Sequence, residues 1–151
     1  MVVDRVESVY RIEHPRLWRA LVSFTGDTDV ASDAESEAFT QALRRGEAIE
    51  DVRAWVWRSA FLIAKGMLAE RRPGGGAPDC VAQSTGSLAE FLALLQGLSD
   101  QQRACVVLRY VGGFRAGEIA KLLGTTANTV RVQLNRAHTS LRTSLREDDD
   151  G

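Results

Sequence analysis

The sequence predicts an all-α fold made of two small helical domains joined by a flexible linker. Apolar residues recur at helical spacing in both halves of the chain, and neither half shows the period-2 alternation that is typical of strands. A stretch rich in proline and glycine, PGGGAPDCVAQSTGS at residues 73–87, separates the halves. We therefore expect one domain at residues 1–72 and a second at 88–146, followed by an acidic tail at 147–151.

Length and composition limit the classes of protein. The 151 residues suit one compact domain or two small ones, and 44% hydrophobic with 26% charged residues is typical of a globular chain. The net charge of -1 means that a nucleic-acid partner would need a local basic patch. No apolar run approaches the roughly 20 residues that span a bilayer, and no signal-peptide pattern is visible. We expect a cytoplasmic protein without membrane insertion.

Catalytic and metal-binding motifs are missing from the sequence. The cysteines, Cys80 and Cys105, form no CxxC motif, and the histidines, His14 and His138, lie far apart. Residues 74–76 are glycines between prolines, which fit a flexible linker better than a phosphate-binding loop. We expect two reduced thiols, no metal, no cofactor and no enzymatic activity.

Three helices are predicted in the first half. Residues 6–24 carry apolar side chains at helical spacing, although Pro15 is expected to kink or interrupt that segment. A second helix should begin near residues 29–32 and end at Arg45, because Gly46 stops it. A third is expected from a capping Asp51 to Arg72, just before a proline.

The second half predicts four helices. The first is expected over residues 87–96, and Ser99 should cap the next, which ends at the glycines of residues 112–113. A short helix should follow over residues 116–123, and Gly124 should then make a tight turn.

The last helix should begin after a cap by Thr125 or Thr126 and run to about Arg146, with a disordered acidic tail beyond it. Its core face carries Val130, Leu134, Ala137, Leu141 and Leu145. The opposite face carries Arg131, Asn135, His138 and Arg142. Between residues 125 and 146 there are four arginines and no Asp or Glu, so positive charge is concentrated here.

A short helix, a glycine turn and a longer basic helix form a helix-turn-helix pattern. The second helix of such a motif enters the major groove with its N-terminal residues, which here are Asn128, Arg131, Val132 and Asn135. Arg and Asn make bidentate contacts with guanine and adenine edges, and the threonines at residues 125, 126 and 129 suit a phosphate oxygen. An ordinary surface helix is the alternative, but such faces usually mix charges of both signs.

The stretch from Leu98 to Arg142 resembles region 4 of the extracytoplasmic-function (ECF) sigma factors. The shared features are the capped Leu98, VVLRY, EIA, LLG, TVR and the Leu-x-Arg-Ala of residues 134–137. The first half is similar to region 2 of the same family, through Tyr10, Leu17, Gly26-Asp27, Asp33, Glu37-x-Phe39 and Ala54-Trp55. The likeness covers nearly the whole chain.

This resemblance implies a subunit that binds the RNA polymerase core and promoter DNA. Region 2 would dock on the β′ clamp and open the −10 element, while region 4 would read the −35 element and contact the β flap. The implied docking residues are Asp33, Ser36, Glu37 and Phe39, although the family often has Gln where Ser36 stands. The implied −35 residues are Thr126, Asn128, Thr129, Arg131, Val132, Asn135 and Arg136.

The third helix departs from the family pattern. The family typically reads AWLxRIARNxxxDxxR, and this chain has Phe61-Leu62 in place of Arg-Asn and Gly66 in place of Asp. Those polar positions help to hold melted DNA, which needs donors and a basic groove. The residues implied at the −10 region or at a partner face are Trp57, Arg58, Phe61, Lys65 and Leu68.

The same helix has two apolar stripes. One is expected in the core and holds Trp55, Val56, Ser59, Leu62, Ile63, Gly66 and Met67. The other holds Trp57, Phe61, Ala64 and Leu68, and a helix that is apolar on two sides is usually buried on two sides. We expect this second stripe to be covered by an anti-sigma factor or by the second half of the chain; alternatively, the first helix packs there.

Three functions remain open on these residues. The leading one is a sigma factor that directs RNA polymerase to specific promoters. The second is a degenerate sigma-like regulator that docks on polymerase or DNA without melting promoters, as the third helix suggests. The third is a stand-alone helix-turn-helix regulator controlled by a ligand in the first half.

Overall fold

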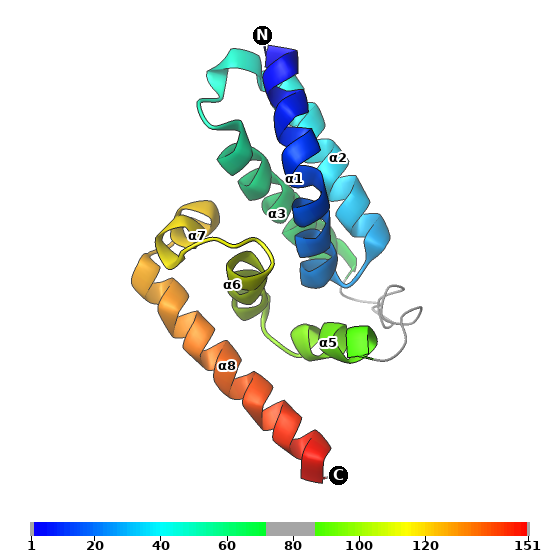
Figure 1. Cartoon of the computed structure of the whole chain (residues 1–151), viewed down its shortest axis with the longest axis vertical. Helices are drawn as coiled ribbons and strands as arrows, with labels where there is room; N and C mark the ends of the chain where they lie inside the picture. Colours follow the sequence, from blue (N-terminus) through cyan, green and yellow to red (C-terminus); the bar gives the residue numbers. More distant parts are fainter. Residues whose placement is uncertain (1, 72–86, 151) are drawn as a thin grey trace.

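The computed structural model describes residues 2–71 and 87–150, and every regular element in these ranges is helical, as predicted (Figure 1). The predicted linker, Cys80 and the glycines at 74–76 lie outside the described residues. The elements are α1 (Val2–Thr25), α2 (Thr28–Arg45), the 3-10 turn η1 (Gly46–Ala48), α3 (Val52–Arg71), α5 (Ser87–Gln96), α6 (Asp100–Tyr110), α7 (Ala116–Leu123) and α8 (Ala127–Asp150).

Helices α1, α2 and α3 pack against one another as a three-helix bundle at the N-terminal end of the molecule (Figure 1). Fully buried side chains at the contacts include Leu17 and Leu21 of α1, Ala34 and Ala38 of α2 and Val56 of α3. Because alanine side chains are small, those of α2 allow α1 and α3 to approach closely, and the three helices form a tightly packed bundle.

Local signals set the ends of these helices close to the predicted places. The Asp27 side chain accepts hydrogen bonds from the backbone N–H groups of Asp29 (2.8 Å) and Val30 (3.2 Å), so it caps α2. Gly46 ends α2 with a φ of 62°, a conformation that favours glycine. The carboxylate of Asp51 accepts from the Ala54 N–H at 3.1 Å at the start of α3.

Pro15 does not interrupt the first helix, contrary to the expectation. Helix α1 is continuous from Val2 to Thr25 with Pro15 inside it. Proline removes one backbone donor and costs about 3 kcal/mol in a helix interior. Leu17 and Leu21 beyond the proline are fully buried and Val6 before it is 3% exposed, so packing on both sides of the proline holds the helix together.

In the second half, α6 and α7 both pack against α8, while α5 packs against α1. Ser99 forms the predicted cap, because its hydroxyl accepts from the Gln102 N–H at 3.2 Å and the Gln102 side chain accepts from the Ser99 N–H. Gly124 ends α7 in the left-handed conformation, as the turn requires.

The C-terminal tail differs from the expectation. Helix α8 continues to Asp150 instead of ending near Arg146, because each further residue extends an existing helix without a new nucleation step. The helix projects away from the rest of the molecule (Figure 1). Leu145, expected in the core, is therefore exposed, whereas Val130 and Ala137 nearer the start of the helix are fully buried.

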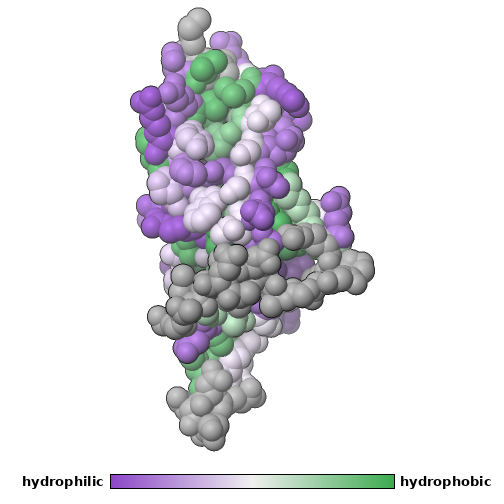
Figure 2. All heavy atoms as spheres, turned by 90° about the vertical axis from the view of Figure 1, so that its right-hand side faces the viewer, coloured by the Kyte–Doolittle hydropathy of each residue, from purple (hydrophilic) through white to green (hydrophobic). Residues whose placement is uncertain are grey.

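The two halves pack against each other, although we expected them to be free to sit apart. Helices α5 and α6 contact α1, and α7 contacts α3. Figure 2 shows another face of the molecule, where a hydrophobic strip lies within a largely hydrophilic surface over the α1–α3 end. Among the described helices, none has a stretch apolar and long enough to span a membrane.

Candidate nucleic-acid interface

The N-terminal half of α8 presents the side chains predicted to read DNA. Asn128, Arg131, Asn135 and Arg136 are exposed, and Val132 is 38% exposed. Thr129 is half-buried, and the hydroxyl of Thr126 accepts from its backbone N–H at 3.1 Å. The structure thus places all seven predicted residues in the first three turns of one helix, with Thr126 as the cap.

Helix α8 is held by contacts on its opposite face. Val130 and Ala137 are fully buried beneath it, and the Tyr110 hydroxyl of α6 lies 2.9 Å from His138 Nε2 in a hydrogen bond. His138, predicted on the polar stripe, is therefore engaged by α6. A firmly seated helix with an outward polar face is what major-groove reading requires.

The arginines of α8 lie on a part of the helix that has no acidic residues. In the part of the chain that the structure describes, Arg131, Arg136, Arg142 and Arg146 form no ion pair. The sequence supplies no acidic residue between positions 125 and 146. Guanidinium groups in this state are available to phosphates or to guanine edges.

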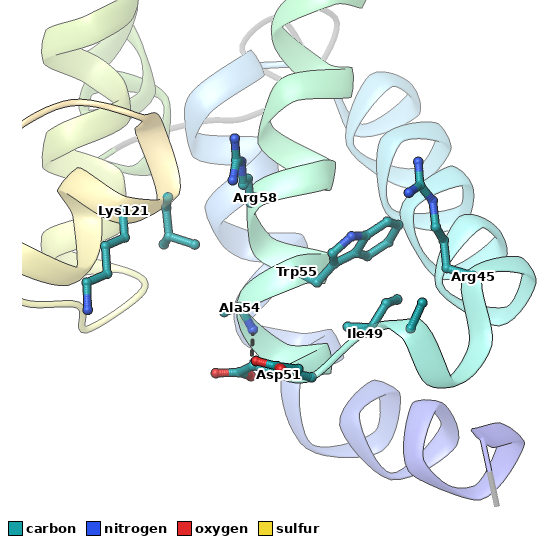
Figure 3. A pocket seen from close by; sticks show the side chains of 10 residues that line it. Arg45, Ile49, Asp51, Ala54, Trp55, Arg58 and Lys121 are labelled. Carbon is teal, nitrogen blue, oxygen red and sulfur yellow. Dashed lines mark hydrogen bonds between the residues drawn. The ribbon is translucent and has the colours of Figure 1, made fainter.

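A second basic feature lies where α7 faces α3. A cavity of about 490 Å³ is bounded by Arg45 of α2, Trp55 and Arg58 of α3, and Lys121 of α7. Figure 3 shows Lys121 on α7, on the other side of the cavity from Trp55 and Arg45. Glu50 and Asp51 line the same cavity, so it is less uniformly positive than α8.

The burial of α3 reverses the predicted order of its two stripes. Trp57 and Ala64 are fully buried and Phe61 is 4% exposed, so the second stripe is the most deeply buried part of the helix. In the stripe expected in the core, Val56 is buried but Leu62 is 55% exposed, and a side chain at Gly66 would meet open space. The remaining members of that stripe, Trp55, Ser59, Ile63 and Met67, are half-buried.

Two of the elements expected to cover the second stripe, α1 and the second half of the chain, both contact it. From α1, the buried carboxylate of Glu13 accepts from Trp57 Nε1 at 3.0 Å, and the Phe24 ring lies 5.1 Å from that of Phe61. From the second half, the Phe114 ring meets Trp57 edge to face at 5.0 Å. Trp57 and Phe61 are thus interior residues, and among the predicted residues of this face only Arg58 and Lys65 are exposed.

The outer face of α2 carries most of the residues implied in polymerase docking. Asp33, Ser36 and Glu37 are exposed. Phe39 is only 7% exposed, and its ring contacts that of Tyr10 at 5.0 Å. Phe39 therefore fixes α2 against α1 from inside the bundle.

Two titratable groups are perturbed by burial. Desolvation raises the pKa of Glu35, whose carboxylate lies 2.6 Å from His14 Nδ1; the His14 charge and hydrogen bond act in the lowering direction. Burial raises the pKa of the Cys105 thiol to about 11. Neither group lies on α8 or lines the cavity of Figure 3.

Sequence reasoning missed the residues that join the two halves: Glu13, Arg53, Arg103 and Phe114. Glu13 had a readable signal, because it stands four residues before the buried Leu17, at a core position of α1 where a carboxylate needs a buried partner. Arg103 had no such signal, since α6 is buried around most of its circumference. Phe114 followed two glycines that we interpreted only as a helix end.

These features define a helix-turn-helix DNA-binding protein. A family model described as Sigma-70, region 4, matches residues 88–141. The chain is 30% identical over 152 residues to the ECF RNA polymerase sigma factor SigL of Mycobacterium tuberculosis, covering 87% of this chain and 83% of the relative. It is also 37% identical over 51 residues to the ECF RNA polymerase sigma factor SigK of Mycobacterium ulcerans, covering 34% of this chain and 27% of the relative. The chain belongs to the ECF sigma factors, and its role lies in promoter-directed transcription.

Two solved structures share the fold. The sigma factor RpoE in complex with the anti-sigma factor NepR, from Bartonella quintana, matches with a TM-score of 0.80 at 20% identity, covering 93% of this chain and 96% of that one. CnrH in complex with the cytosolic domain of CnrY matches with a TM-score of 0.78 at 21% identity, covering 95% and 88%.

Proposed function

We propose that this chain directs the RNA polymerase core to specific promoters, with α8 reading the −35 element and the α1–α3 bundle docking on the β′ clamp and opening the −10 element. The observation that carries the proposal is the first half of α8, where exposed Arg and Asn side chains stand on a stretch of helix without acidic residues. In this proposal the polymerase synthesises RNA, and this chain selects the promoter.

The −35 contacts have a definite chemistry. Arg131 and Asn135 lie one turn apart on an exposed face, where they suit guanine and adenine edges. The N-terminus of α8, capped by Thr126, suits a phosphate oxygen. Because only about four to six cationic groups can neutralise phosphates, binding to free DNA should be weak and strongly salt-dependent. The polymerase then provides specificity by holding both halves on one promoter.

The −10 contacts would use the exposed edge of α3. Trp55 offers a ring on which an unstacked base can lie, while Arg45 and Arg58 offer positive charge in the same cavity. Docking on the β′ clamp would use Asp33, Ser36 and Glu37, which share the exposed face of α2. We also propose a contact of the second half with the β flap, which family membership supports.

An anti-sigma factor is a further partner that we propose. RpoE, which shares this fold, is seen in complex with an anti-sigma factor, and CnrH, which also shares it, is seen with the cytosolic domain of CnrY. In this chain Trp57 and Phe61 are already covered by α1 and by the second half. An anti-sigma factor would therefore have to displace α6 and α7 to reach them.

Transcription in vitro tests the proposal. The wild-type chain should support transcripts from host promoter fragments only when the core polymerase is present, and permanganate should modify thymines in the −10 region. The runner-up is a regulator that occupies the −35 element without melting DNA, and the apolar Phe61 and Leu62 of α3 favour it. Core binding or −35 protection without reactive thymines would support that alternative.

A further inference from the structure

The inference concerns the contact between α1 and α2, which lie side by side in the bundle (Figure 1). Pairs of side chains join the two helices in order, and the order runs in opposite directions along them. On each helix the members stand three or four residues apart, so they share one face. We call these pairs the α1–α2 ladder, and its rungs are Trp18–Ser32, His14–Glu35 and Tyr10–Phe39.

The two outer rungs use large rings of α1. Trp18 Nε1 donates to the Ser32 hydroxyl at 3.1 Å. At the other end, the Tyr10 ring meets the Phe39 ring edge to face, with the ring centres 5.0 Å apart. The Tyr10 ring also stacks on the His14 ring at 4.9 Å, so it connects two rungs. Rings in these geometries attract each other beyond the area that they bury.

The middle rung is a hydrogen bond to a buried carboxyl group. Glu35 is 5% exposed, and its Oε1 lies 2.6 Å from His14 Nδ1. Within the described residues, Glu35 Oε2 has no hydrogen-bond partner. His14 is therefore the group that compensates the burial of this carboxyl. Moving the carboxyl away from His14 would leave it unpaired in the bundle, which is unfavourable, so this rung resists displacement.

The rest of the α1–α2 contact does little to fix how α2 is rotated. Apart from two members of the ladder, the residues that α2 buries are Val30 and four alanines, Ala31, Ala34, Ala38 and Ala42. Packed helices are oriented by ridges of side chains that fit into grooves, and alanines form only shallow ridges. The directional contacts of the ladder therefore define the rotation and the register of α2.

The ladder lies beside the face of α2 that is assigned to the polymerase. Asp33, Ser36 and Glu37 are exposed, and we call them the docking face. Ser36 follows Glu35 directly in the sequence. Because the docking face and the ladder belong to one helix, any rotation of α2 about its axis shifts all three docking side chains together. A binding surface needs its side chains held close to the productive geometry.

We propose that His14 is a positioning residue for polymerase docking, because its rung with Glu35 sets the rotation at which α2 presents the docking face to the core. This rests on the proposed function, which assigns the docking face to the β′ clamp. His14 acts through α2 and needs no contact with the polymerase. Loss of the rung should therefore weaken binding to the core and leave the DNA-reading face of α8 unchanged.

Binding of the full chain to the core polymerase tests this role. His14→Ala should lower the affinity for the core about tenfold, while the affinity for a −35 duplex stays within about twofold. His14→Asn keeps a nitrogen on Cγ, where Nδ1 stands in histidine, and should recover most of the core affinity. Ile12→Ala is the control on the same helix, at a side chain that is 76% exposed, and should change neither affinity.

A double variant separates positioning from stability. His14→Ala leaves the Glu35 carboxyl unpaired inside the bundle, so this variant should also lose stability. His14→Ala combined with Glu35→Ala removes that carboxyl, so it should unfold at a higher urea concentration than His14→Ala, yet bind the core just as weakly. Val56→Ala destabilises the bundle from α3, outside the ladder, and should keep wild-type core affinity.

Two results would overturn the role of His14. Core affinity that recovers together with stability in the double variant would mean that His14 only stabilises the bundle. Wild-type core affinity in folded His14→Ala would mean that the rung does not set docking; if that variant does not fold, equal core affinity of the double variant and His14→Asn would mean the same. A wild-type chain that fails to bind the core would instead contradict the proposed function.

Discussion

Helices α3 and α8 are both long, and both carry two distinct faces, yet the structure uses them in opposite ways. In α3 the second face is aromatic, and Trp57 and Phe61 are buried between α1 and the second half of the chain. In α8 the second face is basic, and Arg131 and Asn135 remain exposed. A helix that is apolar on two sides is covered on two sides, whereas a helix that is apolar on one side leaves the other in solvent, where a ligand can reach it.

The difference separates stability from recognition. Substitutions on the aromatic face of α3 should act mainly on the free energy of unfolding, because this face is buried and therefore cannot contact a ligand. Substitutions on the exposed face of α8 should act mainly on DNA affinity. Each of the following predictions tests whether stability depends mainly on α3 and recognition mainly on α8.

The largest effect is expected from Trp57→Ala. Removing this fully buried ring should lower the free energy of unfolding by about 3–5 kcal/mol, because it leaves a cavity and an unpaired Glu13 oxygen. Leu62→Ala on the same helix, at a side chain that is 55% exposed, should change it by less than about 0.5 kcal/mol. Urea unfolding followed by circular dichroism measures both. Equal losses for the two variants would mean that the stripes are not divided as described.

Arg131→Ala should weaken binding to the cognate −35 duplex in the holoenzyme by roughly ten- to hundredfold. The thermal midpoint of the free protein should stay within about one degree, because the side chain forms no internal ion pair. Arg11→Ala removes an exposed arginine from α1, where it pairs only with the exposed Glu7, and serves as the charge-matched control. A large drop in the thermal midpoint would contradict the assignment of Arg131 to recognition.

Thr126→Ala should show where stability and recognition meet on α8. Its hydroxyl caps the helix through the Thr129 N–H, and its loss should cost about 1 kcal/mol. DNA affinity should fall as well, since the same turn is the one proposed to bind a phosphate. Thr143→Ala, at an exposed threonine further along α8, should leave both quantities unchanged. Chemical unfolding and a fluorescence anisotropy titration separate the two effects.

The smallest effect concerns Cys105 and pH. Burial raises the pKa of its thiol from 9.0 to about 11 in the folded chain, so the unfolded chain loses this proton first. The stabilising contribution is complete below pH 9 and disappears as the pH rises towards 11. At pH 8 the Cys105 thiol of the native chain should be protected from a disulfide reagent and should react only on unfolding, which mass spectrometry of the labelled peptide can follow. Fast labelling of Cys105 in the native chain would contradict this burial.

Much of the fold was predictable because its signals are local. Ser99 as a cap, Gly46 and Gly124 as helix ends and the short helix before the glycine turn can all be recognised within a few residues. The break expected at Pro15 does not occur, because packing of the neighbouring leucines offsets the free-energy cost of a proline inside a helix. The end of α8 misled because a helix that is already formed extends easily.

The functional surfaces were predictable to different degrees. Helix α8 has a single apolar stripe, so only one face could be assigned to the core, and all the arginines and asparagines predicted on the other side are exposed. Helix α3 has two apolar stripes, and which of them is buried depends on tertiary contacts that the sequence does not reveal. Leu62 was therefore wrongly placed in the core. The contact of Phe114 with the first half depends on groups more than 40 residues apart, such as Glu13 and Trp57, and no local pattern connects them.

Arg103 of α6 donates through Nε to the Phe24 carbonyl near the end of α1, and this cap has a practical consequence for dividing the protein. A fragment that ends after α3 would carry the Phe24 carbonyl without its guanidinium donor, and the rings of Phe24 and Trp57 would face water. Exposed aromatic surface of this kind promotes self-association. Isolated halves are therefore poor reagents for this chain, and its polymerase and DNA contacts are best measured on the intact polypeptide.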